Sequence, residues 1–126
     1  MPTYSENGKN SYTAAAAVVK GNVLKFTTAD AQGLPSVTPT TAGTDGAVAI
    51  ALTDANVGEK VAVKILGTGG TTLVKAGGAL SAGDTLGATG AAAAAGDTAI
   101  GVALAGAASG DLVEVATVMP VVVPAG

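Results

Sequence analysis

Apolar and polar residues alternate with a period of two along much of this chain. The clearest case is residues 59–66, where Val61, Val63 and Ile65 fall on one side and Lys60, Ala62 and Lys64 fall on the other. Such alternation is typical of an antiparallel strand with one buried face. Shorter alternating or apolar segments predict further strands over residues 22–28, 37–41, 47–52, 71–75, 84–88, 98–104 and 112–118.

A glycine followed by an acidic residue precedes four of these segments. The pairs are Gly58-Glu59, Gly83-Asp84, Gly96-Asp97 and Gly110-Asp111. Glycine reaches positive φ at little steric cost and Asp bonds its own local backbone, so each pair predicts a turn. We expect Gly58, Gly83 and Gly110 to hold positive φ and to set strand register, with the acids adding local hydrogen bonds. Residues 67–70, Gly-Thr-Gly-Gly, predict a hairpin turn.

The pattern predicts an all-β chain in three parts. Residues 1–13 are polar and predict an extended N-terminal arm, in which Tyr4 and Tyr12 are the candidate contacts with a capsid or another subunit. Residues 14–119 predict a small barrel-like or sandwich-like β domain of short antiparallel strands, with a loop at 91–95. Residues 120–126 predict an extended C-terminal tail that a neighbouring chain can pair with.

The composition predicts a thin core. The 126 residues include one Phe, two Tyr and no Trp, and Ala, Gly, Thr and Val dominate. Alanine supplies little area for burial, and glycine adds backbone entropy that folding must overcome. Disulfides and ordinary zinc sites are excluded, because the sequence has neither Cys nor His. Oligomerisation remains as the source of additional stability, and we expect a homo-oligomer.

The side chains that carry most enzyme chemistry are missing. Without His, the serines have no ordinary base, and no local motif supports Ser–Lys chemistry. Two pairs of carboxylates are candidate ligands for a hard cation, namely Asp54–Glu59 and Asp97–Asp111. Carboxylates that stabilise turns are the simpler interpretation. We therefore expect a protein that is not an enzyme and needs no metal or cofactor.

Charge and hydropathy narrow the possible partners and compartments. The net charge is −3, and all six cations are Lys. Arg supplies the planar fork that reads phosphates and base edges, so its absence argues against nucleic-acid binding. No apolar stretch approaches the roughly 20 residues of a membrane helix, and the first residues lack signal-peptide features. The sequence thus predicts synthesis in a host cytoplasm without membrane insertion.

Three blocks in a fixed order carry a resemblance to a known family. They are Gly58-Glu59-Lys60-Val61-Ala62-Val63, then Ala82-Gly83-Asp84-Thr85-Leu86, then Ile100-Gly101-Val102-Ala103-Leu104 followed by Ser109-Gly110-Asp111-Leu112-Val113-Glu114-Val115. With the neighbouring segment 49–55, this order resembles the capsid cement, or head-decoration, proteins of tailed bacteriophages. The similar stretch covers a little over half of the chain. The longer polar arm and the tail around Pro120 and Pro124 depart from that pattern.

The resemblance implies a structural virion protein. It implies a small barrel-like domain that binds the outer surface of the phage head, bridges major capsid subunits and assembles as a trimer. It brings no catalytic residues. The alternative from another functional class is a carbohydrate-binding or host-surface-binding β module of a phage fibre or a bacterial surface. That class favours exposed aromatic platforms or calcium clusters, and this chain has few aromatic residues.

Overall fold

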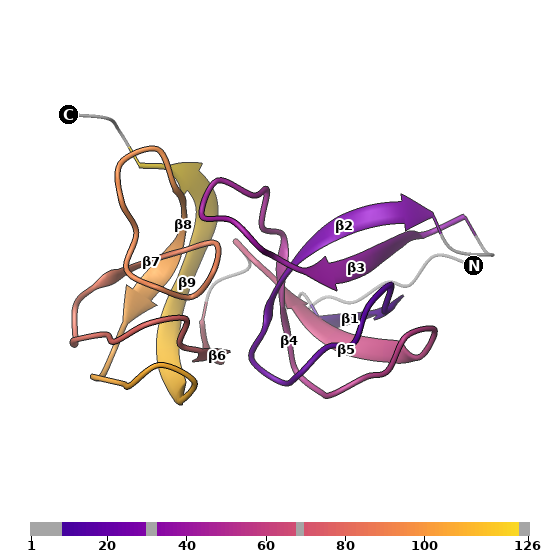
Figure 1. The fold of residues 1–126 in the computed structure, drawn as a ribbon, viewed down its shortest axis with the longest axis horizontal. Coiled ribbons are helices and arrows are strands. Elements are labelled where there is room, and N and C mark those ends of the chain that lie inside the picture. The colour runs from indigo at the N-terminus through magenta and orange to yellow at the C-terminus, as the bar shows by residue number, and fades with distance from the viewer. Residues whose placement is uncertain (1–8, 30–32, 68–69, 124–126) are drawn as a thin grey trace.

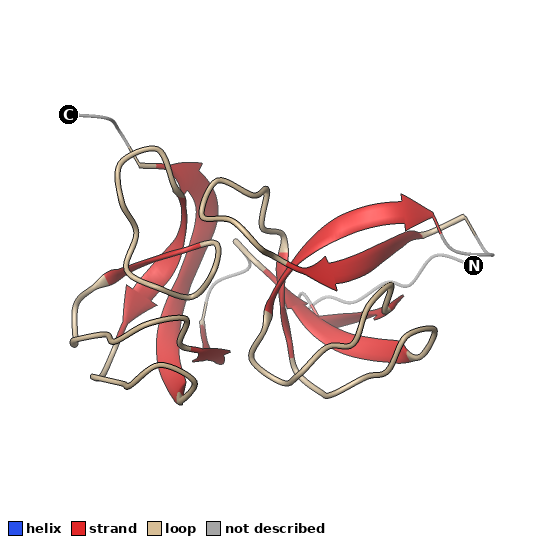
Figure 2. Ribbon diagram, viewed as in Figure 1, coloured by secondary structure: helices blue, strands red, loops and turns tan. Residues whose placement is uncertain are grey.

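The computed structural model describes residues 9–29, 33–67 and 70–123, and these residues form strands, turns and loops without a helix (Figure 2). The strands lie in two lobes, which are side by side in Figure 1. The strands are β1 (Lys9–Thr13), β2 (Val23–Ala29), β3 (Pro35–Pro39), β4 (Ala49–Ala51), β5 (Lys60–Ile65), β6 (Thr71–Lys75), β7 (Thr85–Gly87), β8 (Thr98–Ala103) and β9 (Leu112–Val122). The predicted all-β class is confirmed.

The first lobe is a curled five-stranded antiparallel sheet with the order β1-β5-β4-β2-β3. Its two edge strands approach each other, because Ala14, next to β1, forms a bridge with Val37 of β3. The backbone N–H of Ala15 donates to the carbonyl of Val37 at 2.8 Å. The sheet is therefore a half-barrel whose two edges meet at Val37.

The second lobe is a four-stranded antiparallel sheet with the order β6-β9-β8-β7. The long strand β9 pairs with β6 on one side and with β8 on the other. The outer edge of β7 is covered by the following loop, since Gly87 N–H donates to Ala91 and Ala93 N–H donates to Thr85, each at 2.8 Å. The predicted loop at 91–95 thus protects a sheet edge.

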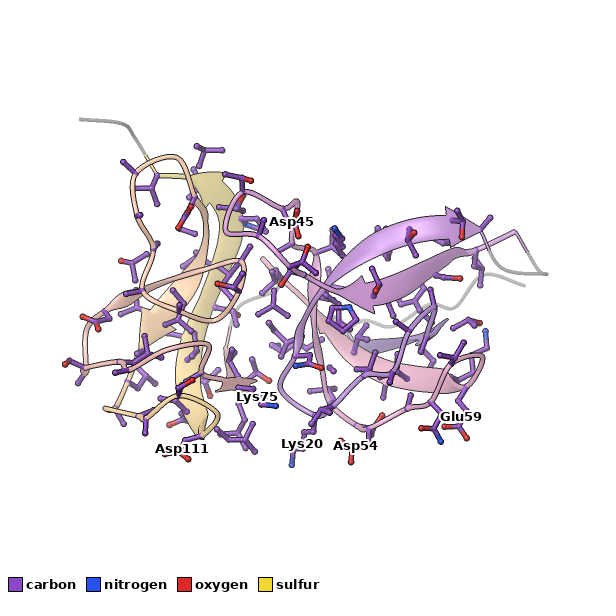
Figure 3. All side chains as sticks on the ribbon, viewed as in Figure 1. Lys20, Asp45, Asp54, Glu59, Lys75 and Asp111 are labelled. Carbon is purple, nitrogen blue, oxygen red and sulfur yellow. The ribbon has the colours of Figure 1, made fainter. Side chains whose placement is uncertain are left out.

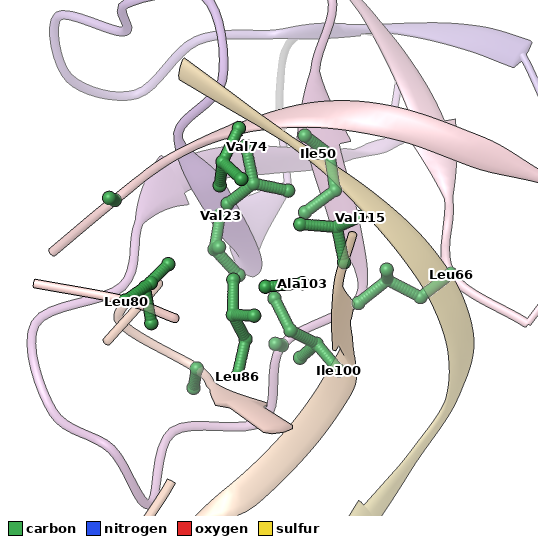
Figure 4. Close-up of a cluster of buried hydrophobic side chains, with 13 residues drawn as sticks. Val23, Ile50, Leu66, Val74, Leu80, Leu86, Ile100, Ala103 and Val115 are labelled. Atoms are coloured by element: carbon green, nitrogen blue, oxygen red, sulfur yellow. The ribbon is translucent and has the colours of Figure 1, made fainter. Parts of the chain in front are cut away.

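Two apolar cores stabilise the fold, one inside the half-barrel and one between the lobes. The inside of the half-barrel buries residues of the first lobe alone, among them Val37, Val61 and Val63. The second core lies between the lobes (Figure 4), where Val23 and Ile50 of the first sheet pack with second-lobe residues such as Val115. These core residues of the described chain are mostly Val and Ala with few larger side chains, as the composition predicted.

Strand β4 shows how three residues serve both cores. Ala49 and Ala51 belong to the core inside the half-barrel, whereas Ile50 between them belongs to the core between the lobes. All three side chains are buried. Because successive side chains of a strand point to opposite faces, one short strand contributes to both cores and ties the lobes together.

Backbone hydrogen bonds also join the lobes. Lys75 N–H donates to Gly21 at 2.8 Å, and Thr98 N–H donates to Gly43 at 2.8 Å. Both acceptors are glycines at close approaches: a Cβ on Gly21 would lie 2.5 Å from Cδ2 of Leu112, and one on Gly43 would lie 2.6 Å from Oδ1 of Asp97. A side chain at Gly21 would also meet the backbone of Lys75 and push the lobes apart, whereas one at Gly43 would displace the Asp97 carboxylate.

The structure differs from the sequence-based expectation in three segments. Residues 9–13 of the predicted arm form β1, which pairs with β5 from Lys9↔Lys64 to Thr13↔Lys60. Strands β5 and β6 do not pair as the predicted hairpin requires, because they belong to different sheets. Residues 68 and 69 of the predicted turn lie outside the described residues. The predicted tail begins inside β9, which continues to Val122 and pairs there with Thr98 of β8. Residues 124–126 lie outside the described part.

Candidate functional site

Five turns in the described structure share one construction. In each, the third residue is a glycine with φ between 87° and 92°, and the fourth carries a side-chain oxygen. That oxygen accepts the backbone N–H of the first residue at 2.7–3.3 Å. The N–H of the fourth residue donates to the carbonyl of the first at 3.0–3.1 Å. The positive φ at the third position is typical of a type II turn. The turns span residues 19–22, 56–59, 81–84, 94–97 and 108–111.

The predicted turn glycines have the conformation that the turn requires. Gly58, Gly83 and Gly110 have φ of 87°, 92° and 91°. The glycine–acid pattern does not include the turn at Gly21, because its fourth residue is Asn22. The amide oxygen of Asn22 replaces the carboxylate and accepts Val19 N–H at 2.8 Å. Asn side chains bond the local backbone as Asp side chains do, so a pattern of glycine followed by either residue predicts this turn.

Four of these turns stabilise the lobes from within, two in each lobe, through the same pair of backbone hydrogen bonds. In the first lobe, Gly21 N–H donates to Ala51 at 2.9 Å and Gly58 N–H donates to Ala14 at 2.8 Å. The second lobe repeats this exchange, since Gly83 N–H donates to Ala103 and Gly110 N–H donates to Ala76, each at 2.8 Å. Each lobe thus contains two similar segments that bind each other reciprocally. The turn glycines are part of the framework.

The carboxylates of the described residues are committed to hydrogen bonds. Those of Glu59, Asp84, Asp97 and Asp111 close turns, and that of Asp54 accepts Lys20 N–H at 2.7 Å. In the parts of the chain that are described, no group of three or more acidic residues is placed to hold a metal ion. These acids therefore act as caps for the backbone.

Asp54 and Glu59 do come together around one shallow hollow. It has a volume of about 280 Å³ and is also lined by residues 17–19 and by Ala55 and Asn56. Figure 3 shows Asp54 and Glu59 on the loops at the lower edge of the first lobe. Each carboxylate accepts a backbone N–H. Asp97 and Asp111, the other pair considered as cation ligands, cap separate turns.

The surroundings of Asp45 stabilise its ionised form. Hydrogen bonds from the backbone N–H groups of Thr41 and Ala42, together with the neighbouring Lys25 ammonium, lower its pKa to about 2. Its Oδ2 accepts Thr41 N–H at 2.8 Å and lies 3.2 Å from Lys25 Nζ. The same loop carries Gly43, which accepts a hydrogen bond from the second lobe. Asp45 therefore orders a loop that connects the lobes.

Tyr12, one of the predicted contact residues of the arm, forms an aromatic pair with Phe26 on the first sheet. The rings of Tyr12 and Phe26 meet edge to face, with centroids 5.3 Å apart and an interplanar angle of 67°. Tyr12 is half-buried and packs against the core of the half-barrel, whereas Phe26 is 40% exposed. Tyr4 lies outside the described residues. The pair gives the surface of the first lobe an aromatic feature shared by β1 and β2.

Comparison with known proteins shows a similarity of fold. No protein-family model and no curated protein matches the sequence. Among solved structures, the chain is similar to the N base of the head fiber gp8.5 in bacteriophage phi29, with a TM-score of 0.68 and 21% sequence identity. The similarity covers 86% of this chain and 92% of that chain. The two proteins therefore share a fold over both lobes. No helix of the described residues is long and apolar enough to cross a membrane.

Proposed function

We propose that this protein is a structural component of a bacteriophage virion that attaches to the head. The observation that carries the proposal is the shared fold with the base of a phage head fiber, which extends over nearly all of both chains. The use of the described carboxylates as turn caps supports a structural role without an enzymatic one. The framework is built from backbone hydrogen bonds and small side chains, which suits a structural component.

Within this role, we propose a decoration or cement protein on the outer surface of the head. Packaged DNA pushes outward on the shell. A protein that spans the boundary between major capsid subunits adds interface that must break before the lattice opens. Weak single contacts suffice, because many copies on a repeating lattice give avidity.

The proposed capsid contact is the segment of residues 1–13 together with the exposed side of the Tyr12–Phe26 pair. Aromatic residues are enriched among the interface side chains that contribute most to affinity, and Tyr adds a hydroxyl that can hydrogen-bond to the partner. Strand β1 pairs with β5 and holds Tyr12 against Phe26, so the proposed contact contains an ordered aromatic anchor.

Two measurements test this function. Electron cryomicroscopy of virions that contain this chain should show density for both lobes on the outer surface of the head, at boundaries between capsid subunits. Purified protein added to heads that lack it should bind and raise the temperature at which the heads release DNA. Density at a fibre tip or on the tail, with binding to host glycans, would support the host-surface alternative and overturn the proposal.

A further inference from the structure

The outer face of the four-stranded sheet is apolar and uncovered. Its inner face buries Val74, Val113 and Val115 in the core between the lobes. Residues that alternate with these point the opposite way, and Leu73 of β6 and Leu112 of β9 are 39% and 44% exposed. Leu104, which directly follows β8, is 48% exposed. Three leucines on one side of one sheet form a patch, whereas single exposed leucines are unremarkable.

The strand register places these side chains next to one another. Leu73 lies directly opposite Glu114 of β9, and Leu104 N–H donates to the Glu114 carbonyl at 2.9 Å. Glu114 thus has a leucine on each side. Lys75 lies opposite Leu112, two residues further along β6 and β9. Directly opposite residues of an antiparallel pair have Cβ atoms roughly 4.5–5.5 Å apart. We call this surface the outer sheet face; it consists of Thr71, Leu73, Lys75, Val102, Leu104, Leu112, Glu114 and Ala116.

The outer sheet face carries one negative and one positive charge. Within the described residues, neither Glu114 nor Lys75 forms an ion pair. The Thr71 hydroxyl donates to Oε2 of Glu114 at 3.1 Å, which orients the carboxylate and leaves Oε1 for another donor. The backbone N–H of Lys75 donates to Gly21 at 2.8 Å, so the first lobe lies beside this end of the outer sheet face. The Glu114 carboxylate is therefore oriented within an apolar surface, and Lys75 supplies the opposite charge on the same face.

We propose that the outer sheet face is the surface through which two copies of this chain associate. An apolar surface with one anion and one cation is complementary to itself: when a second copy faces it, Glu114 of each copy can meet Lys75 of the other while the leucines pack between them. A strongly acidic or basic partner would not match a face with no net charge. This proposal concerns the isolated protein and does not depend on the virion function.

Charge reversal tests the contact directly. In sedimentation equilibrium of the full chain, the wild type should associate as its concentration rises. Lys75→Glu and Glu114→Lys should each weaken self-association at least about tenfold, because each places like charges against each other. The double variant Lys75→Glu/Glu114→Lys should recover it. Mixing the two single variants should also recover association, since their faces are then opposite in charge.

Leucine substitution tests the apolar part with a matched control. Leu104→Asp should abolish association, because it buries a charge among leucines. Val57→Asp is the control, since Val57 is 67% exposed in a turn of the first lobe, away from the outer sheet face. It should leave the association constant unchanged. Circular dichroism melting of each variant checks that the fold is kept.

Three results would overturn the proposal. The wild type could stay monomeric at every concentration. The double and mixed charge variants could associate no better than the single variants. Leu104→Asp could leave the assembly intact and remove only binding to heads, which would show that a capsid protein covers this face. The virion function would fail on a different result, which is the absence of the protein from the head.

Discussion

Glycine and its acidic neighbour contribute unequally to each turn. Gly110 has a φ of 91°, and a Cβ there would meet no atom within 4 Å. Space is therefore available, and a side chain is disfavoured by the backbone conformation alone, which costs roughly 1–2 kcal/mol for an L residue in the left-handed region. Asp111 contributes an exposed bond of 3.3 Å to Ala108 N–H, and such a bond contributes about 0.5–1.5 kcal/mol at most.

We therefore expect Gly110→Val to destabilise the protein more than Asp111→Ala. Urea denaturation of both variants measures the two changes in the free energy of unfolding. The competing hypothesis is that these acids form a functional site. It predicts that Asp84→Ala or Asp111→Ala abolishes binding to heads while the thermal stability stays at the wild-type value, and that pair of results would contradict the structural role assigned to the turns.

Asp45 makes one part of the stability dependent on pH. Its folded pKa of about 2 lies below the ordinary value of 3.8. A carboxyl whose pKa is depressed on folding stabilises the folded state above its ordinary pKa, and the contribution is lost as the pH falls toward the folded pKa. The loss therefore occupies the interval from about pH 4 down to about pH 2.

The matched variant is Asp45→Asn, which keeps the shape and removes the charge. Between pH 4 and pH 2 the wild-type melting temperature should fall more steeply than that of the variant, and at neutral pH the wild type should be the more stable of the two. Differential scanning calorimetry at several pH values measures both curves. Parallel curves would show that ionisation of Asp45 does not stabilise the folded protein.

Among the elements, the strands were predictable where alternation was strong and a turn glycine stood before them. Strand β1 was missed because Lys9–Thr13 has a single large apolar side chain, Tyr12, and such an edge strand lacks the pattern of a core strand. The link between β5 and β6 was mistaken for a hairpin, because Gly-rich turns between two short strands signal a reversal but do not say which sheet the next strand joins. Sheet partnership depends on packing between the lobes.

The position of β1 changes what a deletion of the arm should do. Removing residues 1–8 keeps β1 and its pairing with β5, so we expect an unchanged melting temperature and weaker binding to heads. Removing residues 1–13 also removes one of the two strand partners of β5 and the ring of Tyr12 from the half-barrel core. That larger deletion should lower the melting temperature by more than about 5 °C.

The two deletions separate folding from binding. Thermal melting and co-sedimentation with heads measure both properties on the same samples. Full head binding by the chain that lacks residues 1–8 would contradict a capsid contact in the arm. A melting temperature of the larger deletion equal to that of the wild type would contradict a structural role for β1.

At the scale of the whole molecule, the sequence indicated a thin core and a structural role, but it did not show how that core is made sufficient. The lobes share one core through Val23 and Ile50, and backbone bonds at Gly21 and Gly43 reinforce the junction. The contact that each glycine makes with the other lobe cannot be recognised from the sequence, because it depends on what approaches the glycine in the folded protein. The outer sheet face was hidden for the same reason, since its leucines and charges come from separate segments of the chain.

The whole chain should fold and melt without a metal ion. A cation held by several carboxylates would have to compete with the backbone N–H groups that these carboxylates already accept in their turns. Ligand binding to the folded state raises the melting temperature, so removal of a bound ion would lower it. We expect EDTA and added calcium to leave the melting temperature unchanged within error. A fall of many degrees in EDTA that calcium reverses would show that turn carboxylates bind metal, and it would make the hollow beside Asp54 and Glu59 the first place to look.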